Sequence, residues 1–443
     1  MRWRVLIPVF GLAGLCGLFC VMAAAFILDR NAGEKKLDAP APVPTLITHG
    51  EYLARLGDCA ACHTASGRPA FSGGVRFATP IGGVYSTNIT FDPNYGIGRF
   101  TLADFDRALR FGVVEGHSLY PAMPFPSYAN TKPEDVAALY VYFKYGVPPA
   151  AIPNVTNDIS FPLSMRWPLT FWRLLFSPRP KPFIATAGTD PVIDRGAYLV
   201  EGLGHCGECH TPRNLALQVR AQKASDGSIF LSGAVVDSYF APSLRQGSAD
   251  TLGDWSERDI VDFLKTGTNP YGLVFGSMTD VIVHSTQYLT RDDAVAIAKY
   301  LETLSASADS RDRPYAYDDS VHLAIKSGDA SNTGARVYID NCAACRRPDG
   351  LGYERVFPRL AGNPVVEAPD AASLISIVLT GSQTPRTAET PAQFSMPAFA
   401  WRLSDQDVAN VINFIRSGWG NSASKTSATV VAAFRKTLVP SQH

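Results

Sequence analysis

Three cysteine pairs with the spacing C-x-x-C constrain the fold and the chemistry of this chain more than any other feature. They occur as "CAACH" at residues 59–63, "CGECH" at 206–210 and "CAACR" at 342–346. Cysteines at positions i and i+3 of a helical turn point to the same side, so both sulfur atoms can bond one planar group. A disulfide, a zinc site and a thioredoxin-like redox pair are the alternatives for this spacing.

The residue that follows each pair separates these alternatives. A histidine directly after C-x-x-C is the attachment pattern of c-type haem, in which the sulfur atoms bond the porphyrin and the imidazole binds iron. A zinc site would need a second pair of ligands nearby, and a thioredoxin-like site would need a βαβ context; the sequence has neither pattern. We therefore expect haem c at the first two pairs, held by Cys59, Cys62, His63, Cys206, Cys209 and His210.

The cysteine pairs belong to a threefold internal repeat. A glycine and an aromatic residue precede each pair, in "GEYLARLGDCAACHT", "GAYLVEGLGHCGECHT" and "GARVYIDNCAACRRP". Each repeat continues with a helix expected to start at Thr101, Ser256 or Ser373 as N-cap and to end at a glycine. A closing helix with acidic residues in its first turn completes the repeat. The pattern predicts domains at 46–150, 191–308 and 326–420, a linker or docking segment at 151–190 and a tail at 421–443.

A methionine lies at the same point of each repeat, in the loop before the closing helix: Met123, Met278 and Met396. A lone methionine is most often core filler, but the prolines beside Met123 and Met396 stiffen these loops. A thioether opposite a histidine gives His/Met-ligated iron, whose reduction potential is higher than that of bis-histidine iron. We expect the axial pairs His63–Met123 and His210–Met278.

Other side chains near these sites leave alternatives open. His205 precedes a haem cysteine and His284 follows Met278, so both compete for the second iron. Arg245 and Arg359 occupy matching positions after the cysteines. There they predict either hydrogen bonds to haem propionates or ordinary loop capping.

The third pair departs from the pattern because Arg346 follows it. A guanidinium stays protonated and has no lone pair to give to iron. No histidine occurs between His322 and the C-terminal residue, so the third repeat has no local replacement. Three outcomes follow: haem attached through Cys342 and Cys345 with Met396 as the iron ligand, an empty site with the cysteines joined in a disulfide, or a sequence variant in a chain otherwise built for haem. We predict that the third haem is absent or poorly ligated.

The N-terminal region predicts export. Residues 5–28 contain no charged residue and follow Arg2 and Arg4. At about 1.5 Å per residue this run can cross the roughly 30 Å hydrocarbon layer, which predicts a transmembrane anchor within residues 1–30 and an exported body. A signal peptide cleaved near Ala23–Ala25 is the alternative. Lys plus Arg and Asp plus Glu number 40 each, so we expect no nucleic-acid partner.

Three longer stretches carry a resemblance to a known family: "YPAMPFPSY", "GSMTDVIVHSTQYLT" and "MPAFAWRLSDQDVANVINFIRSGWGN". With the cysteine motifs they resemble the tri-haem cytochrome c subunit of membrane-bound alcohol, aldehyde and gluconate dehydrogenases of acetic acid bacteria. The resemblance covers nearly all of residues 46–420. It implies an all-α fold of three tandem class I cytochrome c domains after an N-terminal transmembrane anchor, at the periplasmic face of the inner membrane. It also implies electron transfer from a large catalytic dehydrogenase subunit, of quinoprotein, molybdopterin or flavin type, to ubiquinone in the respiratory chain.

Two rival functions belong to other classes. The sequence has no nucleophile elbow, phosphate loop or dinucleotide fingerprint, so we expect no catalytic residue and an electron carrier rather than an enzyme. A di-haem peroxidase is the alternative, but it needs an iron with an open site, and the third repeat lacks the proximal histidine of peroxidases. A redox sensor would need an output domain, which the sequence lacks.

Overall fold

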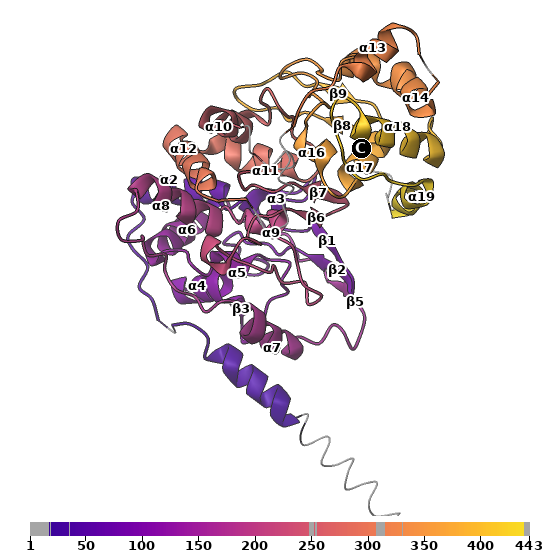
Figure 1. The fold of residues 1–443 in the computed structure, drawn as a ribbon. Helices are drawn as coiled ribbons and strands as arrows, with labels where there is room; N and C mark the ends of the chain where they lie inside the picture. The colour runs from indigo at the N-terminus through magenta and orange to yellow at the C-terminus, as the bar shows by residue number, and fades with distance from the viewer. Residues whose placement is uncertain are drawn as a thin grey trace, which may run out of the picture. The chain divides into compact units, whose positions relative to one another are not determined.

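The computed structural model describes residues 17, 19–34, 36–247, 252, 255–306, 315–329 and 331–437 (Figure 1). The chain forms two compact units, residues 1–184 and 185–443. The first unit contains the first repeat, and the second unit contains the second and third repeats. The predicted boundary between a second and a third domain therefore stays a prediction.

The first unit is built from short helices joined by long loops. After a helical stretch at residues 19–30, its helices are α2 (Pro44–Leu56), α3 (Cys59–His63), α4 (Leu102–Phe111), α5 (Phe125–Tyr128), α6 (Pro133–Tyr145) and α7 (Trp167–Phe176). Its strands form an antiparallel sheet in the order β1-β2-β5 and a hairpin β3-β4. Their bounds are β1 (Arg76–Thr79), β2 (Gly82–Tyr85), β3 (Val113–Val114), β4 (His117–Ser118) and β5 (Asp158–Ile159).

The second unit repeats this plan twice. Its second-repeat elements are α8 (Pro191–Glu201), α9 (Gly207–His210), η1 (Ala224–Asp226), β6 (Ala234–Val236), β7 (Tyr239–Ala241), α10 (Glu257–Thr266), α11 (Met278–His284), η2 (Thr286–Tyr288) and α12 (Arg291–Glu302). Its third-repeat elements are α13 (Ser320–Lys326), α14 (Thr333–Asn341), α15 (Ala343–Arg346), α16 (Pro364–Glu367), α17 (Ala372–Thr380), β8 (Ser382–Gln383), β9 (Ser395–Met396), α18 (Asp405–Ser417) and α19 (Ala428–Thr437). The pairs β6-β7 and β8-β9 are antiparallel.

The glycine shared by the repeats lies where the first and last helices of each repeat cross, in the pairs α2/α6, α8/α12 and α14/α18. A Cβ added at Gly50 would lie 2.6 Å from the Cβ of Tyr142 and would also collide with a backbone carbonyl. Gly196 meets Tyr300 at 2.6 Å in the same way. Gly334 in the third repeat lies against Phe414 and a backbone carbonyl of α18. The glycine is therefore required for close helix packing.

Capping explains where the amphipathic helices start and end. Thr101 and Ser256 cap α4 and α10 with reciprocal capping boxes, as expected. Glycines with positive φ follow α4, α10 and α17, which confirms the expected stops. The expected N-cap at Ser373 is wrong, because α17 begins at Ala372 and its first N–H donates to Asp370.

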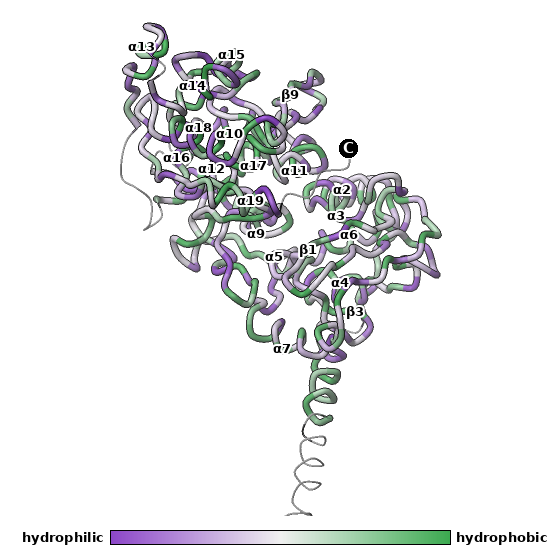
Figure 2. Tube along the Cα trace, turned by 90° about the vertical axis from the view of Figure 1, so that its right-hand side faces the viewer, coloured by the Kyte–Doolittle hydropathy of each residue, from purple (hydrophilic) through white to green (hydrophobic). Residues whose placement is uncertain are grey.

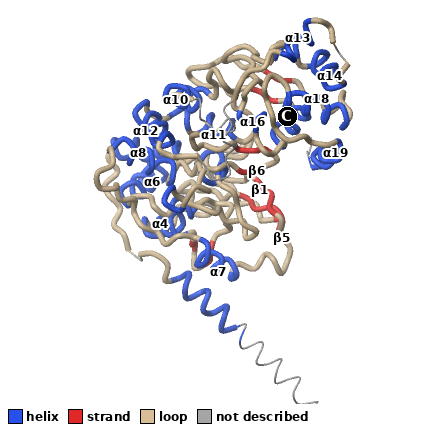
Figure 3. The backbone as a smooth tube through the Cα atoms, viewed as in Figure 1, coloured by secondary structure: helices blue, strands red, loops and turns tan. Residues whose placement is uncertain are grey.

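The expected all-α class is also wrong. The described residues contain four small antiparallel sheets, drawn in red in Figure 3. The pairs β1-β2 and β6-β7 lie in the long loops between the cysteine helices and the amphipathic helices, and β5 joins β2 from the segment between α6 and α7. Gly82 is the first residue of β2, directly after the turn from β1, and has a φ of +133°. Glycine adopts this conformation easily, which allows the loop to form a hairpin. Periodicity predicted the helices but gave no signal for strands of two to four residues.

The structure likewise does not bear out the expected transmembrane anchor. Within the described residues, no helix combines the length and the apolar character needed to cross a bilayer. Residues 1–16 and 18 of the expected segment lie outside the described part of the chain. The described helical stretch at 19–30 is apolar over most of its length, as the green tube in Figure 2 shows.

A buried carboxylate joins this stretch to the segment after the first repeat. Asp29 pairs with Arg173 of α7 at 3.0 Å and accepts a hydrogen bond from Thr170 at 2.8 Å. Ser118 of β4 also donates to Asp29, at 3.0 Å. These partners satisfy a charge that would be costly to bury alone. Part of the predicted linker, α7, thus packs on the first repeat.

Candidate haem-binding sites

The first C-x-x-C-H motif forms a single helical turn, α3. The Nδ1 atom of His63 lies 2.7 Å from the carbonyl oxygen of Thr87, in the loop after β2. A carbonyl only accepts, so Nδ1 must carry the hydrogen, and Nε2 keeps its lone pair. Burial lowers the pKa of His63, and the bond to Thr87 opposes this shift. The imidazole is therefore neutral and oriented, as a metal ligand must be.

The second motif has the same geometry. The Nδ1 atom of His210 lies 2.7 Å from the carbonyl oxygen of Pro242, which follows β7. The residue is buried, and burial is the main cause that lowers its pKa, against the opposing bond to Pro242. The two histidines thus make equivalent hydrogen bonds in two units that share no residue, although His63 is half-buried and His210 is buried.

The cysteines beside these histidines are free thiols in the structure, and no described cysteine forms a disulfide. Burial raises the pKa of Cys59 to about 12, with smaller contributions from Asp58 and Cys62. Burial likewise raises the pKa of Cys206 to about 12. Desolvation thus keeps both thiols protonated, and both residues are half-buried.

The three methionines occupy different local structures. Met123 lies in the turn that precedes α5, where its carbonyl accepts from Phe125. Met278 is the first residue of α11, and Met396 ends the short strand β9. The pairing of His63 with Met123 and of His210 with Met278 stays a prediction. His205 and His284 also remain as predicted competitors.

In the third repeat Arg346 takes the place of the histidine. Its Nη1 donates to the carbonyl oxygen of Pro358 at 2.7 Å, and its Nη2 lies 3.8 Å from the sulfur of Met396. Burial lowers the pKa of the guanidinium, and Tyr338 and the cysteines of the motif oppose this shift. The group remains a cation, because an arginine in a protein does not lose its proton.

Arg245 and Arg359, for which the sequence allowed propionate binding or loop capping, both donate to backbone carbonyls. Arg245 donates to the carbonyl oxygens of Ser305 and Phe230, at 2.6 and 2.9 Å, and is buried. Arg359 donates to the carbonyl of Ala361 and stacks on Tyr315. Both geometries correspond to loop capping, the alternative reading of these arginines.

Sequence reasoning missed Arg68. Its Nη1 is buried without a hydrogen-bond partner in the described residues, in the loop whose Gly73 N–H donates to the carbonyl of His63. A buried cationic donor without an acceptor is a suitable place for a propionate carboxylate. The signal in the sequence was its position five residues after His63. The first site therefore has the groups that haem requires: an imidazole ligand in His63, two cysteine sulfur atoms, and a hydrogen-bond donor in Arg68.

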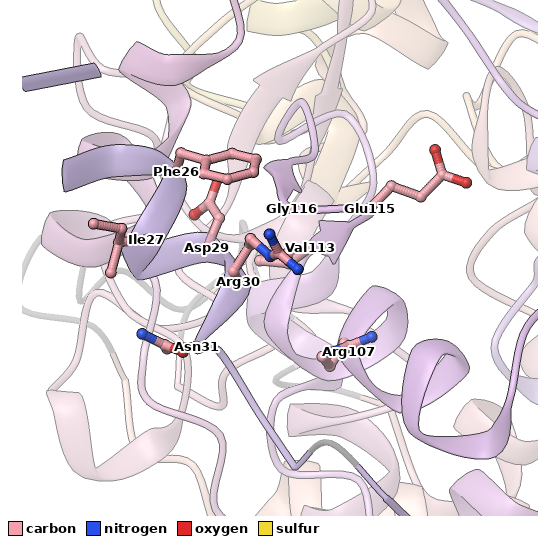
Figure 4. Close-up of a pocket in the computed structure, with 9 residues that line it drawn as sticks. All are labelled: Phe26, Ile27, Asp29, Arg30, Asn31, Arg107, Val113, Glu115 and Gly116. Atoms are coloured by element: carbon pink, nitrogen blue, oxygen red, sulfur yellow. The ribbon is translucent and has the colours of Figure 1, made fainter. Parts of the chain in front are cut away.

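A separate cavity of about 780 Å³ lies in the first unit beside the helical stretch at 19–30 (Figure 4). Its wall combines apolar side chains with the cations Arg30 and Arg107 and the carboxylates Asp29 and Glu115. Gly116, in the turn of the β3-β4 hairpin, also lines it. Met123 follows Gly116 by seven residues in the sequence.

Comparison with known proteins agrees with this geometry. The cytochrome c family matches residues 331–419, which is the third repeat. The chain is 50% identical over 422 residues to the cytochrome c subunit of a quinone alcohol dehydrogenase from Gluconacetobacter polyoxogenes, covering 94% of this chain and 90% of that protein. It is 50% identical to the gluconate 2-dehydrogenase cytochrome c subunit of Pantoea cypripedii, with 88% and 90% covered. The fructose dehydrogenase cytochrome subunit of Gluconobacter japonicus is 35% identical, with 88% and 82% covered.

Haem-attachment motifs with oriented, neutral histidines define a c-type cytochrome. The identity over nearly the whole length shows that the chain belongs to the family of dehydrogenase cytochrome c subunits. Members of this family are electron-carrier subunits rather than catalytic subunits, and the cytochrome c family implies haem c as cofactor.

Proposed function

We propose that this chain passes electrons from a large catalytic dehydrogenase subunit to ubiquinone in the respiratory chain. The observation that carries the proposal is the equivalent placement of His63 and His210, each with Nδ1 bonded to a backbone carbonyl. Bound haem supplies one-electron chemistry without a proton or an atom transferred to the protein. The proposed function needs no catalytic side chain from this subunit.

The residues that hold the cofactor follow from the motifs. Cys59 and Cys62 would bond the first haem, and Cys206 and Cys209 would bond the second. His63 and His210 would bind the iron on one side, and we propose Met123 and Met278 for the other side. Arg68 would neutralise a propionate of the first haem. The carbonyls of Thr87 and Pro242 keep each imidazole in one tautomer, which keeps the ligand geometry fixed when the charge at the site changes.

The nature of the dehydrogenase partner is supported by the relatives. Their names refer to quinone alcohol, gluconate and fructose dehydrogenases. We propose a partner of the quinoprotein, molybdopterin or flavin type that oxidises an alcohol, an aldehyde or a sugar acid. Substrate specificity belongs to that partner, since this chain has no substrate chemistry of its own.

Ubiquinone is proposed as the acceptor, with its head group in the cavity beside residues 19–30. The cavity volume lies within the range of small-molecule sites, and Arg30 and Arg107 offer donors to quinone carbonyls. Exposed apolar side chains of the adjacent helix, including Phe19 and Ile27, offer a surface for a lipophilic tail. We place the subunit in the periplasm, at the surface of the inner membrane, because haem cysteines must be exported and ubiquinone lies in the bilayer.

The haem ligands are tested in the full chain expressed with a working haem-maturation system. Replacing His63 or His210 with alanine should each remove one low-spin haem from the spectrum and part of the methionine-to-iron charge-transfer band. His117→Ala, at an exposed position of β4, is the control and should leave both unchanged. A colourless wild-type protein would refute the proposal, and peroxide turnover by the isolated chain would favour the di-haem peroxidase.

A further inference from the structure

We infer that the third repeat holds no haem, and that the guanidinium of Arg346 takes its place by bridging the Pro358 carbonyl and the Met396 sulfur. The inference rests on the proposed function, because it concerns the number of haems in the same electron carrier. Its observations belong to the second unit alone.

The first observation is that Arg346 uses the acceptor that a histidine would use. The carbonyls of Thr87, Pro242 and Pro358 come from the same loop of the three repeats, and each accepts a hydrogen bond of 2.7 Å from the residue after C-x-x-C. The arginine therefore occupies the proximal position itself. It does not swing out to solvent and leave the position open.

The second observation is the contact on the other side of the guanidinium. Its Nη2 lies 3.8 Å from the sulfur of Met396, the residue expected to bind iron. A porphyrin between them would need about 3.5 Å of van der Waals separation on the guanidinium side, because arginine cannot bond iron. The iron–sulfur bond would need further space on the other side. A separation of 3.8 Å cannot contain both.

The third observation is that side chains of this repeat fill its interior. Cys342 and Met396 pack against a core that includes Trp419, which is fully buried. The ring of Trp419 lies 5.2 Å from that of Tyr338 and 5.5 Å from that of Phe414, between centroids. The third repeat thus has an apolar core of its own.

A buried cation strengthens this core without a cofactor. Arg416 is fully buried and donates to the carbonyls of Ser424, Val366 and Ala368, at 2.7, 3.0 and 2.8 Å. These bonds join α18 to the loop after α16 and to the segment that leads to α19. The third repeat therefore keeps the cytochrome c fold, and the electron route contains only the two irons of the first two repeats.

The experiment counts haems and free cysteines in the same preparation of full-length, matured protein. Pyridine haemochrome absorbance per chain should give two haems. After reduction and denaturation, iodoacetamide should modify Cys342 and Cys345, while thioether bonds protect the four cysteines of the first two motifs, as read by peptide mass mapping. Arg346→His should raise the count to three and protect both cysteines. Arg347→His, the matched control at the next residue, should leave the count at two, because Arg347 pairs with Asp349 instead.

Each outcome decides the inference. Three haems in the wild-type chain would overturn it, whatever the variants do. An Arg346→His variant that stays at two haems would show that Arg346 is not what excludes the third. A wild-type chain without any haem would refute the proposed function instead, so the two failures are distinguishable.

Discussion

In each of the three repeats, a backbone carbonyl after the cysteine helix is the partner of the residue that follows the C-x-x-C motif. It orients a ligand in His63 and His210 and anchors a cation in Arg346. The sequence alone predicted the ligands and showed the departure at Arg346, because C-x-x-C-H is a contiguous motif. It could not identify the carbonyl acceptors, since any residue supplies a carbonyl and only the path of the loop brings one to the ring. For the same reason Arg68 escaped notice, while Arg245, placed by matching position, proved to cap a loop.

The proposed quinone site gives a prediction at the scale of one residue. Arg30→Gln removes a cation from the cavity but keeps a side chain of similar length. With electrons supplied by the dehydrogenase partner, the KM for a short-chain ubiquinone should rise about tenfold at an unchanged kcat, because a charge-assisted hydrogen bond is worth about 1.5–3 kcal/mol. Arg99→Gln, an exposed arginine of the same unit, is the control. An unchanged KM for Arg30→Gln would remove the cavity from the proposal.

At the scale of elements, the crossing of the first and last helices is the most regular feature of the three repeats. The helices and their caps were predictable because apolar periodicity and Ser/Thr N-caps are local signals. The sequence showed that the glycine is shared by the repeats. Its role at a helix crossing depends on a partner roughly 80 to 105 residues away, such as Tyr300 for Gly196. The misplaced N-cap at Ser373 has a similar cause. The Ser373 hydroxyl forms hydrogen bonds with Phe240 of β7, and no local sequence pattern predicts this contact.

The crossing glycine of the second repeat provides a stability test. Gly196→Ala places a Cβ against a backbone carbonyl of α12 and the Cβ of Tyr300. Overpacking of this kind costs about 1–3 kcal/mol, so we expect the thermal midpoint of the affected unit to fall by about 10 °C in circular dichroism.

Gly272→Ala is the matched control from the same repeat. Its added Cβ would meet nothing closer than 3.6 Å, at Trp255, and its midpoint should stay within about 2 °C of the wild type. Equal midpoints for both variants would show that the crossing tolerates a methyl group.

At the scale of the whole molecule, the second unit joins two repeats through polar contacts. Ser373 of α17 accepts from the N–H of Phe240 at 2.7 Å and donates to its carbonyl at 3.1 Å. Ser376, one turn later, donates to the carbonyl of Ser238 at 2.6 Å. Both serines are almost fully buried, so these bonds have no water to replace them. The internal repeat predicted three domains of similar size. It could not predict the contacts between the second and third repeats, because these depend on side chains, such as Ser373 and Ser376, that the repeats do not share.

Removing one of these hydroxyls should loosen the junction. Ser373→Ala leaves the N–H and the carbonyl of Phe240 without their partner, at a cost of about 1–2 kcal/mol. Hydrogen exchange of β7 amides should therefore become about tenfold faster in the full chain. Ser331→Ala, at an exposed position, should leave this exchange unchanged. Unaltered protection in Ser373→Ala would mean that other contacts hold the two repeats together.

The bridge made by Arg346 has a practical consequence for stoichiometry. Copies of this subunit in a purified complex are conveniently counted by dividing the Soret absorbance by the number of chromophores assumed for each chain. A divisor taken from three attachment motifs would count too few copies and suggest that catalytic subunits are in excess. Amino-acid analysis, which does not depend on colour, would give the number of copies without this error.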